Sequence, residues 1–152
     1  MRIFSLDSQQ WFDHSLEDVF AFFADPQNLE VITPPWLHFE IATHGKIEMH
    51  QGTKIDYELC LHGIPLGWRS EITVWDPPHR FVDEQLRGPY RLWRHEHGFM
   101  RQDSRTQVLD HVDYAILGGW LVQKLLVARD LERIFEFRRR KLKEIFGDPG
   151  PE

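Results

Sequence analysis

The residues best suited to chemistry lie in one short stretch, from Trp93 to Phe99, with the sequence WRHEHGF. Side chains of a β-strand alternate between its two faces, so a strand here places His95 and His97 on the same face as the aromatic residues at its ends. An inward face with two imidazoles between aromatic rings is typical of a mostly apolar cavity in which a few polar groups orient a ligand. The stretch therefore predicts a ligand chamber.

Carboxylates are predicted to reach the same chamber from neighbouring strands. With Phe81 facing inward, Asp83 and Gln85 follow by alternation, and Asp110 takes an inward position on a later strand. Buried carboxylates need hydrogen-bond partners, which imidazoles can supply. Three interpretations stay open: a structural polar network, contacts that orient a ligand, or proton transfer by a histidine–aspartate pair. The candidates for proton transfer are His95, His97, Asp83 and Asp110.

Metal binding and nucleophilic catalysis receive less support. A His-x-His pair with Asp83 or Asp110 nearby offers ligand types that zinc or iron accept. Nothing in the spacing, however, points directly to a third ligand. The single cysteine, Cys60, has no neighbours that would mark it as a reactive thiolate. No glycine-rich phosphate loop and no Gly-x-Ser-x-Gly motif occurs. We predict no metal and no cofactor.

Composition narrows the class of protein and its partners. The 152 residues are 41% hydrophobic and 13% aromatic, which excludes a disordered chain. A net charge of -6 argues against nucleic acid as a partner. The single cysteine fits a reducing compartment, and the N-terminus is unlike a signal peptide. No apolar stretch is long enough to span a bilayer. We therefore predict a cytoplasmic protein without stable membrane insertion, and we expect a monomer or a homodimer.

The elements that must position the site follow from periodicity and turn residues. Ser15 is predicted to cap a helix with an apolar stripe through Phe23, and Pro26 to begin a second short helix. Gly118 and Gly119 are read as a bend before one long amphipathic helix. The predicted strands are 4–12, 36–43, 53–62, 66–75, 81–86, 90–101 and 106–117, and the long helix is 120–146.

Consecutive strands joined by short turns favour an antiparallel sheet, whose apolar face needs a large partner. The long helix is the natural partner, so we predict an α+β helix-grip fold in which a curved antiparallel sheet of about seven strands wraps around it. We expect one domain over residues 1–147 and a short tail over 148–152.

Four segments carry a resemblance to a known family: VFAFFADPQNL at 19–29, ITPPWL at 32–37, WDPPHRF at 75–81 and GPYRLW at 88–93. With the whole layout, they resemble the SRPBCC superfamily of birch-pollen-type allergens, START lipid-transfer domains and polyketide cyclases, and in particular its bacterial cyclase/dehydrase-like members. The resemblance implies a hydrophobic cavity between sheet and helix. It supplies no invariant catalytic residue, because this fold serves transport, sensing and catalysis.

The function predicted is binding, for transport or sensing, of a hydrophobic or aromatic small molecule or lipid. The alternatives are a cyclase, dehydratase or hydrolase that uses the histidine–aspartate pair, and a protein–protein accessory module. Polar ligand contacts are predicted from Asp83, Gln85, His95, His97 and Asp110. The predicted apolar walls are Tyr57, Leu59, Trp68, Ile72, Phe81, Trp93, Phe99, Val112, Tyr114, Leu125 and Phe135.

Two further segments have open interpretations. The basic run 138–143 suits the negative end of the helix dipole, or else contacts anionic headgroups or a partner protein. Trp36 and Leu37, which follow two prolines, form either a lid over the cavity or part of the core.

Overall fold

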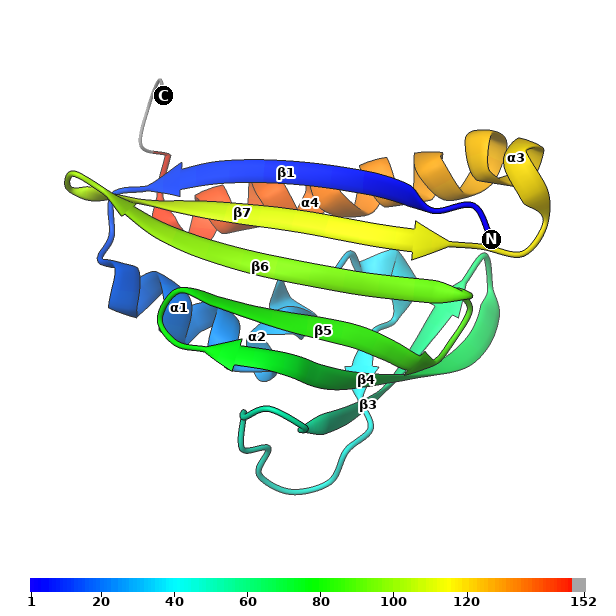
Figure 1. Ribbon diagram of the computed structural model, residues 1–152, viewed down its shortest axis with the longest axis horizontal. Helices are drawn as coiled ribbons and strands as arrows, with labels where there is room; N and C mark the ends of the chain where they lie inside the picture. Colours follow the sequence, from blue (N-terminus) through cyan, green and yellow to red (C-terminus); the bar gives the residue numbers. More distant parts are fainter. Residues whose placement is uncertain (149–152) are drawn as a thin grey trace.

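The computed structural model describes residues 1–148 (Figure 1). Its strands are β1 (Phe4–Phe12), β2 (Glu40–Ile41), β3 (Lys54–Leu61), β4 (Ile64–Asp76), β5 (Arg80–Arg87), β6 (Leu92–Gln102) and β7 (Arg105–Ala115). Its helices are α1 (Leu16–Ala24), α2 (Gln27–Val31), the 3-10 turn η1 (Pro35–Leu37), α3 (Gly119–Val122), the π-helical η2 (Gln123–Val127) and α4 (Ala128–Phe146).

All seven strands form one antiparallel sheet in the order β1-β7-β6-β5-β4-β3-β2. The first strand returns to pair with the last along its whole length, from Phe4 opposite Tyr114 to Phe12 opposite Thr106. Figure 1 shows the curved sheet in front, with α4 running behind β1 and β7, and α1 and α2 below it. The predicted α+β helix-grip architecture is confirmed.

The N-terminal helices form where the sequence signals place them. The Ser15 side chain accepts a hydrogen bond from the backbone N–H of Asp18, which caps α1. Leu16, Val19 and Phe20 form the buried face of that helix. This face joins a core cluster with residues of β1, β6 and α4, so α1 closes one end of the space between helix and sheet.

The segment after α2 differs from the strand predicted over 36–43. Residues Pro35–Leu37 form a 3-10 turn, and only Glu40 and Ile41 pair with β3. Two consecutive prolines fix the backbone and remove amide donors, which delays entry into the sheet until after His38, a residue with φ of 46°. Of the two candidate lid residues, Leu37 is buried and Trp36 is exposed against the ring of Phe137.

The long helix predicted over 120–146 is present but is not regular throughout. The chain turns at Gly118 and Gly119, both with positive φ, then runs through α3 and a π-helical segment before α4. A π turn contains more residues than an α turn, so it shifts the phase of the side chains that precede it. Of the predicted tail, residues 149–152 lie outside the described part of the chain.

The core is divided into two apolar clusters by a band of polar side chains. The cluster at the α1 end includes Phe99 of β6 and Val108 of β7. The other cluster includes Val112 of β7 and Leu131 of α4. The inward positions between them on the same strands are polar and form the site described below. No helix within residues 1–148 is long and apolar enough to cross a membrane.

Candidate ligand site

Two stacked imidazoles lie at the centre of the site. His95 and His97 are alternate residues of β6, so both point inward, and each retains only 6% of its surface exposed. Their ring centroids are 3.7 Å apart with the planes inclined by 24°. Phe81 of β5 stacks on His97 at 4.1 Å. The inward direction predicted for this strand is therefore observed.

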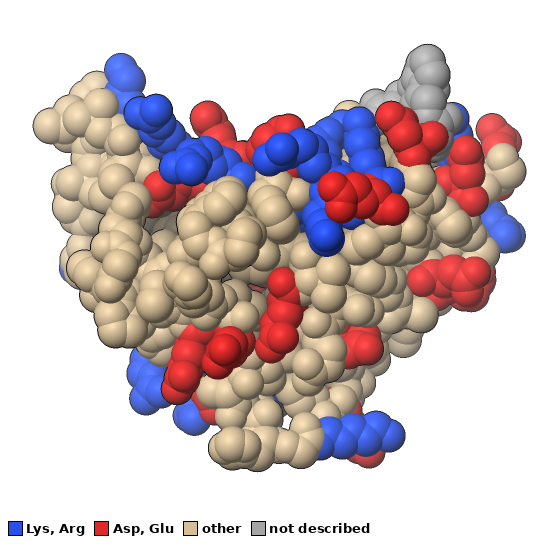
Figure 2. Space-filling view, turned by 180° about the vertical axis from the view of Figure 1, so that it is seen from behind, with Lys and Arg blue, Asp and Glu red and all other residues tan. Residues whose placement is uncertain are grey.

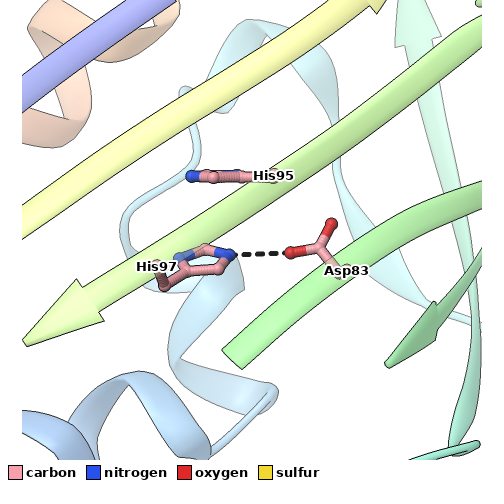
Figure 3. A group of neighbouring side chains, drawn as sticks. All are labelled: Asp83, His95 and His97. Carbon is pink, nitrogen blue, oxygen red and sulfur yellow. Dashed lines mark hydrogen bonds and ion pairs between the residues drawn. The ribbon is translucent and has the colours of Figure 1, made fainter. Parts of the chain in front are cut away.

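Each imidazole contacts a carboxylate on a different flanking strand. His97 Nε2 lies 2.7 Å from Asp83 Oδ2 on β5 (Figure 3). His95 Nε2 lies 2.7 Å from Asp110 Oδ1 on β7. In the strand register Asp83 is opposite His95 and Asp110 is opposite His97, so both hydrogen bonds run diagonally. The two rings consequently direct their Nε2 atoms toward opposite sides of β6, as the stacked pair in Figure 3 illustrates.

A buried guanidinium from α4 completes the cluster. Arg138 Nη2 donates to Asp110 Oδ1 at 3.1 Å, and the side chain retains 8% of its surface. The guanidinium carbon lies 5.4 Å from the centroid of the Phe23 ring and 5.9 Å from that of Phe135. Arg138 thus belongs to the interior and not to a solvent-exposed basic run. Farther along the same run, Arg140 pairs with Glu136 of the preceding turn at 3.7 Å.

Burial and charge together set the protonation of the cluster. Burial, and then the nearby charge of His95, lower the pKa of His97 to about 4, although Asp83 and Asp110 oppose this shift. Burial raises the pKa of Asp110, but Arg138 and His95 outweigh that effect and hold it below its usual range. Burial also raises the pKa of Asp83, and the hydrogen bond from His97 and the positive charges nearby reverse the shift. At neutral pH, therefore, both carboxylates are ionised and His97 is neutral.

The free nitrogens of the two rings differ in access. A neutral imidazole that donates from Nε2–H to a carboxylate carries its lone pair on Nδ1. Nδ1 of His97 is fully buried without a hydrogen-bond partner, and it lies 3.5 Å from Asp110 Oδ1. Nδ1 of His95 also makes no hydrogen bond to a described residue, but it is not among the fully buried atoms. Of the two Nδ1 atoms, that of His95 is therefore the one that a ligand can reach.

Metal ligation is possible only after a rearrangement of the cluster. Asp83, His95 and His97 offer ligand atoms that lie within 4.8 Å of one another. A metal ion must lie near the plane of each imidazole that binds it, and two face-to-face rings share no such point. At least one ring would have to rotate and give up its carboxylate, so the arrangement described here favours hydrogen bonding.

The cluster faces a cavity of about 200 Å³ between the sheet and α4. Four residues of α4 at positions 131, 134, 135 and 138 form one wall, because this spacing keeps them on one helix face. The interior polar lining consists of Ser70, Asp83, His95, His97 and Arg138, and Asp25, Asn28 and Thr33 contribute from the α1–α2 side. The apolar lining is Phe22, Phe23, Leu29, Ile32, Leu37, Phe39, Met49, Ile55, Tyr57, Leu59, Leu61, Trp68, Ile72, Phe81, Tyr90, Trp93, Leu131, Ile134 and Phe135.

Ten of the residues predicted to bind a ligand line this cavity: Tyr57, Leu59, Trp68, Ile72, Phe81, Asp83, Trp93, His95, His97 and Phe135. Asp110 lies behind the imidazoles and acts on the cavity through them and Arg138. Phe99, Val112 and Tyr114 are buried in the apolar clusters. Gln85 instead binds the backbone of Tyr90, with Nε2 donating to its carbonyl at 2.7 Å.

Leu125 is a predicted wall residue that the structure places at the surface. Its side chain is 63% exposed and takes no part in the cavity lining. Six residues separate Leu125 from Leu131, which at 3.6 residues per turn leaves Leu125 about a third of a turn away from the cavity face, and in the π-helical η2 the buried residue is Gln123. The sequence carries no proline or glycine that would announce this irregularity.

Sequence reasoning missed Arg138 and, apart from Leu37 as a candidate lid residue, the wall that α1, α2 and the following loop provide. Arg138 did carry a signal: it continues the spacing of Leu131 and Phe135 and precedes Leu142 by four residues, so a regular helix must turn it inward. A charged residue at an apolar stripe position predicts a buried partner. The second wall had no comparable signal, because its position depends on how α1 packs across the sheet.

Several solved structures share this architecture. Major latex-like protein 151 from Panax ginseng matches with a TM-score of 0.70 and 12% sequence identity, over 95% of this chain and 97% of that chain. Protein Ms6760 from Mycobacterium smegmatis matches with a TM-score of 0.67 and 17% identity, over 93% and 89%. The Zhui aromatase/cyclase from Streptomyces sp. R1128 matches with a TM-score of 0.66 and 14% identity, over 95% and 96%.

No protein-family model matches the chain, and no curated protein matches its sequence. At identities this low, the structural matches establish the fold alone. The chain shares the fold of these proteins, which is the helix-grip fold that the sequence resemblance predicted.

Proposed function

We propose that this helix-grip protein binds a mostly apolar small molecule in the cavity between the sheet and α4, for transport or sensing. The observation that carries the proposal is the combination of an apolar lining with one interior group of ionisable side chains, Asp83, His95, His97 and Arg138. Apolar walls give affinity by removing ligand surface from water, and a few polar groups fix orientation. A core that served stability alone would gain more from apolar residues at these four positions.

The cavity volume limits the size of the ligand. A dry apolar cavity of roughly 150 Å³ accommodates a benzene molecule. A volume of about 200 Å³ therefore suits a compact molecule of one or two rings, or a short branched chain, better than a two-chain lipid. Aromatic side chains from several elements line it, which favours a planar ligand.

The polar cluster defines what functional group the ligand should carry. Asp83 retains 21% of its side-chain surface, and Nδ1 of His95 is open to hydrogen bonding. The ionised Asp83 accepts hydrogen bonds at neutral pH, so a ligand hydroxyl or protonated nitrogen would donate to it, and Nδ1 of His95 is a second site for a polar ligand atom. Arg138 donates from Nη2 to Asp110, while its buried Nε–H has no hydrogen-bond partner among the described residues, so the guanidinium keeps an unused donor beside these acceptors. We infer an apolar ligand with at least one hydrogen-bond donor.

The test is to recover the ligand and to block the cavity. Protein purified without detergent is analysed by native mass spectrometry and by organic extraction, and the emptied protein is titrated with 2-naphthol, followed by tryptophan fluorescence. The variant Leu59→Trp fills part of the cavity, and Met100→Trp adds the same side chain at an exposed position. We expect saturable binding that Leu59→Trp abolishes and Met100→Trp preserves. Absence of both a recovered ligand and saturable probe binding would refute the proposal.

Proton transfer at His95 is a second candidate function, favoured by one observation. Its Nε2 lies 2.7 Å from a carboxylate and its Nδ1 makes no hydrogen bond to a described residue, which is the arrangement of general base catalysis when the imidazole donates from Nε2. Arg138 shares the same Asp110 oxygen and so reduces the negative charge that would strengthen this base. The discriminating measurement incubates the extracted compound with the emptied protein and follows its mass. Conversion that His95→Gln abolishes while binding persists would establish an enzyme, and an unchanged compound supports binding alone.

A further inference from the structure

Apolar side chains project from the end of the molecule where the last strand passes into the terminal helix. Leu117, Trp120, Leu121 and Leu125 are 64%, 52%, 58% and 63% exposed, and Leu126 is 45% exposed. We call these five residues the α3 tip. Large apolar side chains exposed together, unlike scattered single ones, mark a surface that meets another apolar phase.

The first residues of the chain extend the same surface. The pairing of β1 with β7 places Phe4 opposite Tyr114, so Met1 and Ile3 lie beside the connection that leads to the tip. Their side chains are exposed as well. Figure 1 shows the N-terminus next to the loop that enters α3.

The residues of the α3 tip cannot easily turn inward, because another side chain already occupies the inward position of this helical turn. Gln123 of η2 is buried, and its Nε2 donates to the hydroxyl of Tyr114 at 2.8 Å. That bond fixes which face of the helical turn meets the sheet. The leucines and the tryptophan around it therefore face solvent as a consequence of the fold.

The charge around the tip is positive, although the whole chain carries a net charge of -6. Between Tyr114 and Arg129 the sequence has no aspartate or glutamate, and none occurs in residues 1–6. Lys124 Nζ lies 5.1 Å over the ring of Trp120, and Arg2 stacks on Phe4 in the same region. Figure 2 shows this end, at the upper left, as a tan projection with blue atoms along its upper edge.

We propose that the α3 tip docks on the surface of an anionic lipid bilayer. Exposed tryptophan and leucine insert at the level of the headgroups, and neighbouring lysine and arginine are attracted to anionic lipid. A second copy of the same chain fits less well, because symmetric pairing would bring each copy's Lys124 and Arg2 against cations of the same kind. The docking is peripheral, with the apolar side chains alone entering the bilayer.

The tip is continuous with the cavity wall. Helix α4 begins directly after η2, and Leu131 and Ile134 on its first turns line the cavity. Docking would hold this end of the cavity close to the membrane, where apolar ligands concentrate. That consequence rests on the proposed function, whereas the docking itself does not.

The test is co-sedimentation of the purified protein with vesicles of equal parts phosphatidylserine and phosphatidylcholine, compared with vesicles of phosphatidylcholine alone. The variants are Trp120→Ser/Leu121→Ser, which removes apolar surface, and Arg2→Gln/Lys124→Gln, which removes charge. The matched controls are Met100→Ser and Arg101→Gln, exposed positions at the opposite end of β6. All substituted side chains are exposed or at the tip, so circular dichroism should report an unchanged fold.

We expect binding to the anionic vesicles that weakens about tenfold or more without the two apolar side chains. Loss of the two cations should weaken it roughly tenfold and remove the preference for phosphatidylserine. Absence of binding by the unaltered protein, or equal losses in the control variants, would overturn the proposal. So would light scattering that finds a dimer which Trp120→Ser/Leu121→Ser converts to a monomer without any vesicle binding. Every variant is also titrated with 2-naphthol, so that a loss of vesicle binding is distinguished from a loss of ligand binding in the cavity.

Discussion

Arg138→Met tests whether the polar cluster is electrostatically coupled across the helix–sheet interface. Methionine keeps most of the volume and the apolar stem of arginine, so it removes the charge with little loss of packing. The guanidinium contacts Asp110 Oδ1 at 3.1 Å, and both side chains are 8% exposed. The variant leaves Asp110 buried with only the hydrogen bond from His95.

The expected cost follows from the burial of both partners. Removing one member of a buried ion pair costs about 3 to 5 kcal/mol, because the remaining charge lacks compensation. Asp110 keeps one imidazole partner, so we expect about 3 kcal/mol in the free energy of unfolding, at the lower end of that range. Asp110→Asn should cost a similar amount, because it leaves Arg138 buried and uncompensated. The double variant should cost about the same as either single variant, giving a coupling energy of about 2 to 3 kcal/mol.

The assay is urea unfolding followed by tryptophan fluorescence and circular dichroism, at neutral pH and again at mildly acidic pH. The loss in Arg138→Met should be smaller at the acidic pH, because uptake of a proton by the cluster restores its charge balance. Arg140→Met is the matched control on the same helix: its pair with Glu136 is exposed, so it should change the free energy of unfolding by less than about 0.5 kcal/mol. Additive costs in the double variant would refute the coupling, and equal losses in Arg138→Met and Arg140→Met would refute the burial of Arg138.

The remaining predictions concern pH, core packing and backbone strain. The unfolded chain takes up a proton at His97 near pH 6.5, whereas the folded protein keeps this ring neutral down to about 4, so stability should fall as pH falls through that window. The difference corresponds to about 3 kcal/mol from this residue, and His97→Phe should flatten the pH profile of chemical unfolding. Leu142→Ala, at a fully buried position of α4, should cost about 2 to 5 kcal/mol in the free energy of unfolding, whereas Ile145→Ala, partly exposed on the same helix, should cost under about 1.5 kcal/mol. Gly118→Ala should lower the thermal midpoint more than Gly119→Ala, because both have positive φ but only at Gly118 would the new Cβ meet Val122 Cγ2, at 2.9 Å; equal effects would assign the cost to backbone strain alone.

Much of the sheet was predictable because its signals are local. Alternation in β6 places His95 and His97 inward in any antiparallel sheet that buries Phe99, and the register needs only short turns between strands. Capping at Ser15 follows in the same way from residues adjacent in the chain. Local patterns did not place Trp36, because a proline pair changed the backbone there. They also did not place Leu125, which lies off the helix face that Leu131 and Phe135 turn to the cavity.

The pairing within the cluster needed the folded structure. Sequence alternation brings Asp83 and Asp110 to the correct face but does not decide which imidazole each one binds, and the observed bonds cross diagonally between strands. Arg138 joins them from an element 28 residues away, through the position of α4 over β7. Contacts of this kind depend on relative placement to within about an ångström, which periodicity does not specify.

The sequence by itself determined the α+β class, six of the seven strands, the terminal helix and the inward direction of two histidines and two aspartates, because side-chain periodicity and turn chemistry act over a few residues. Tertiary structure alone decided the volume of the cavity, the burial of Arg138 and the exposure of Trp120 and its apolar neighbours. These properties depend on the distance and rotation of α4 against the sheet, which result from packing many side chains at once and not from any single segment.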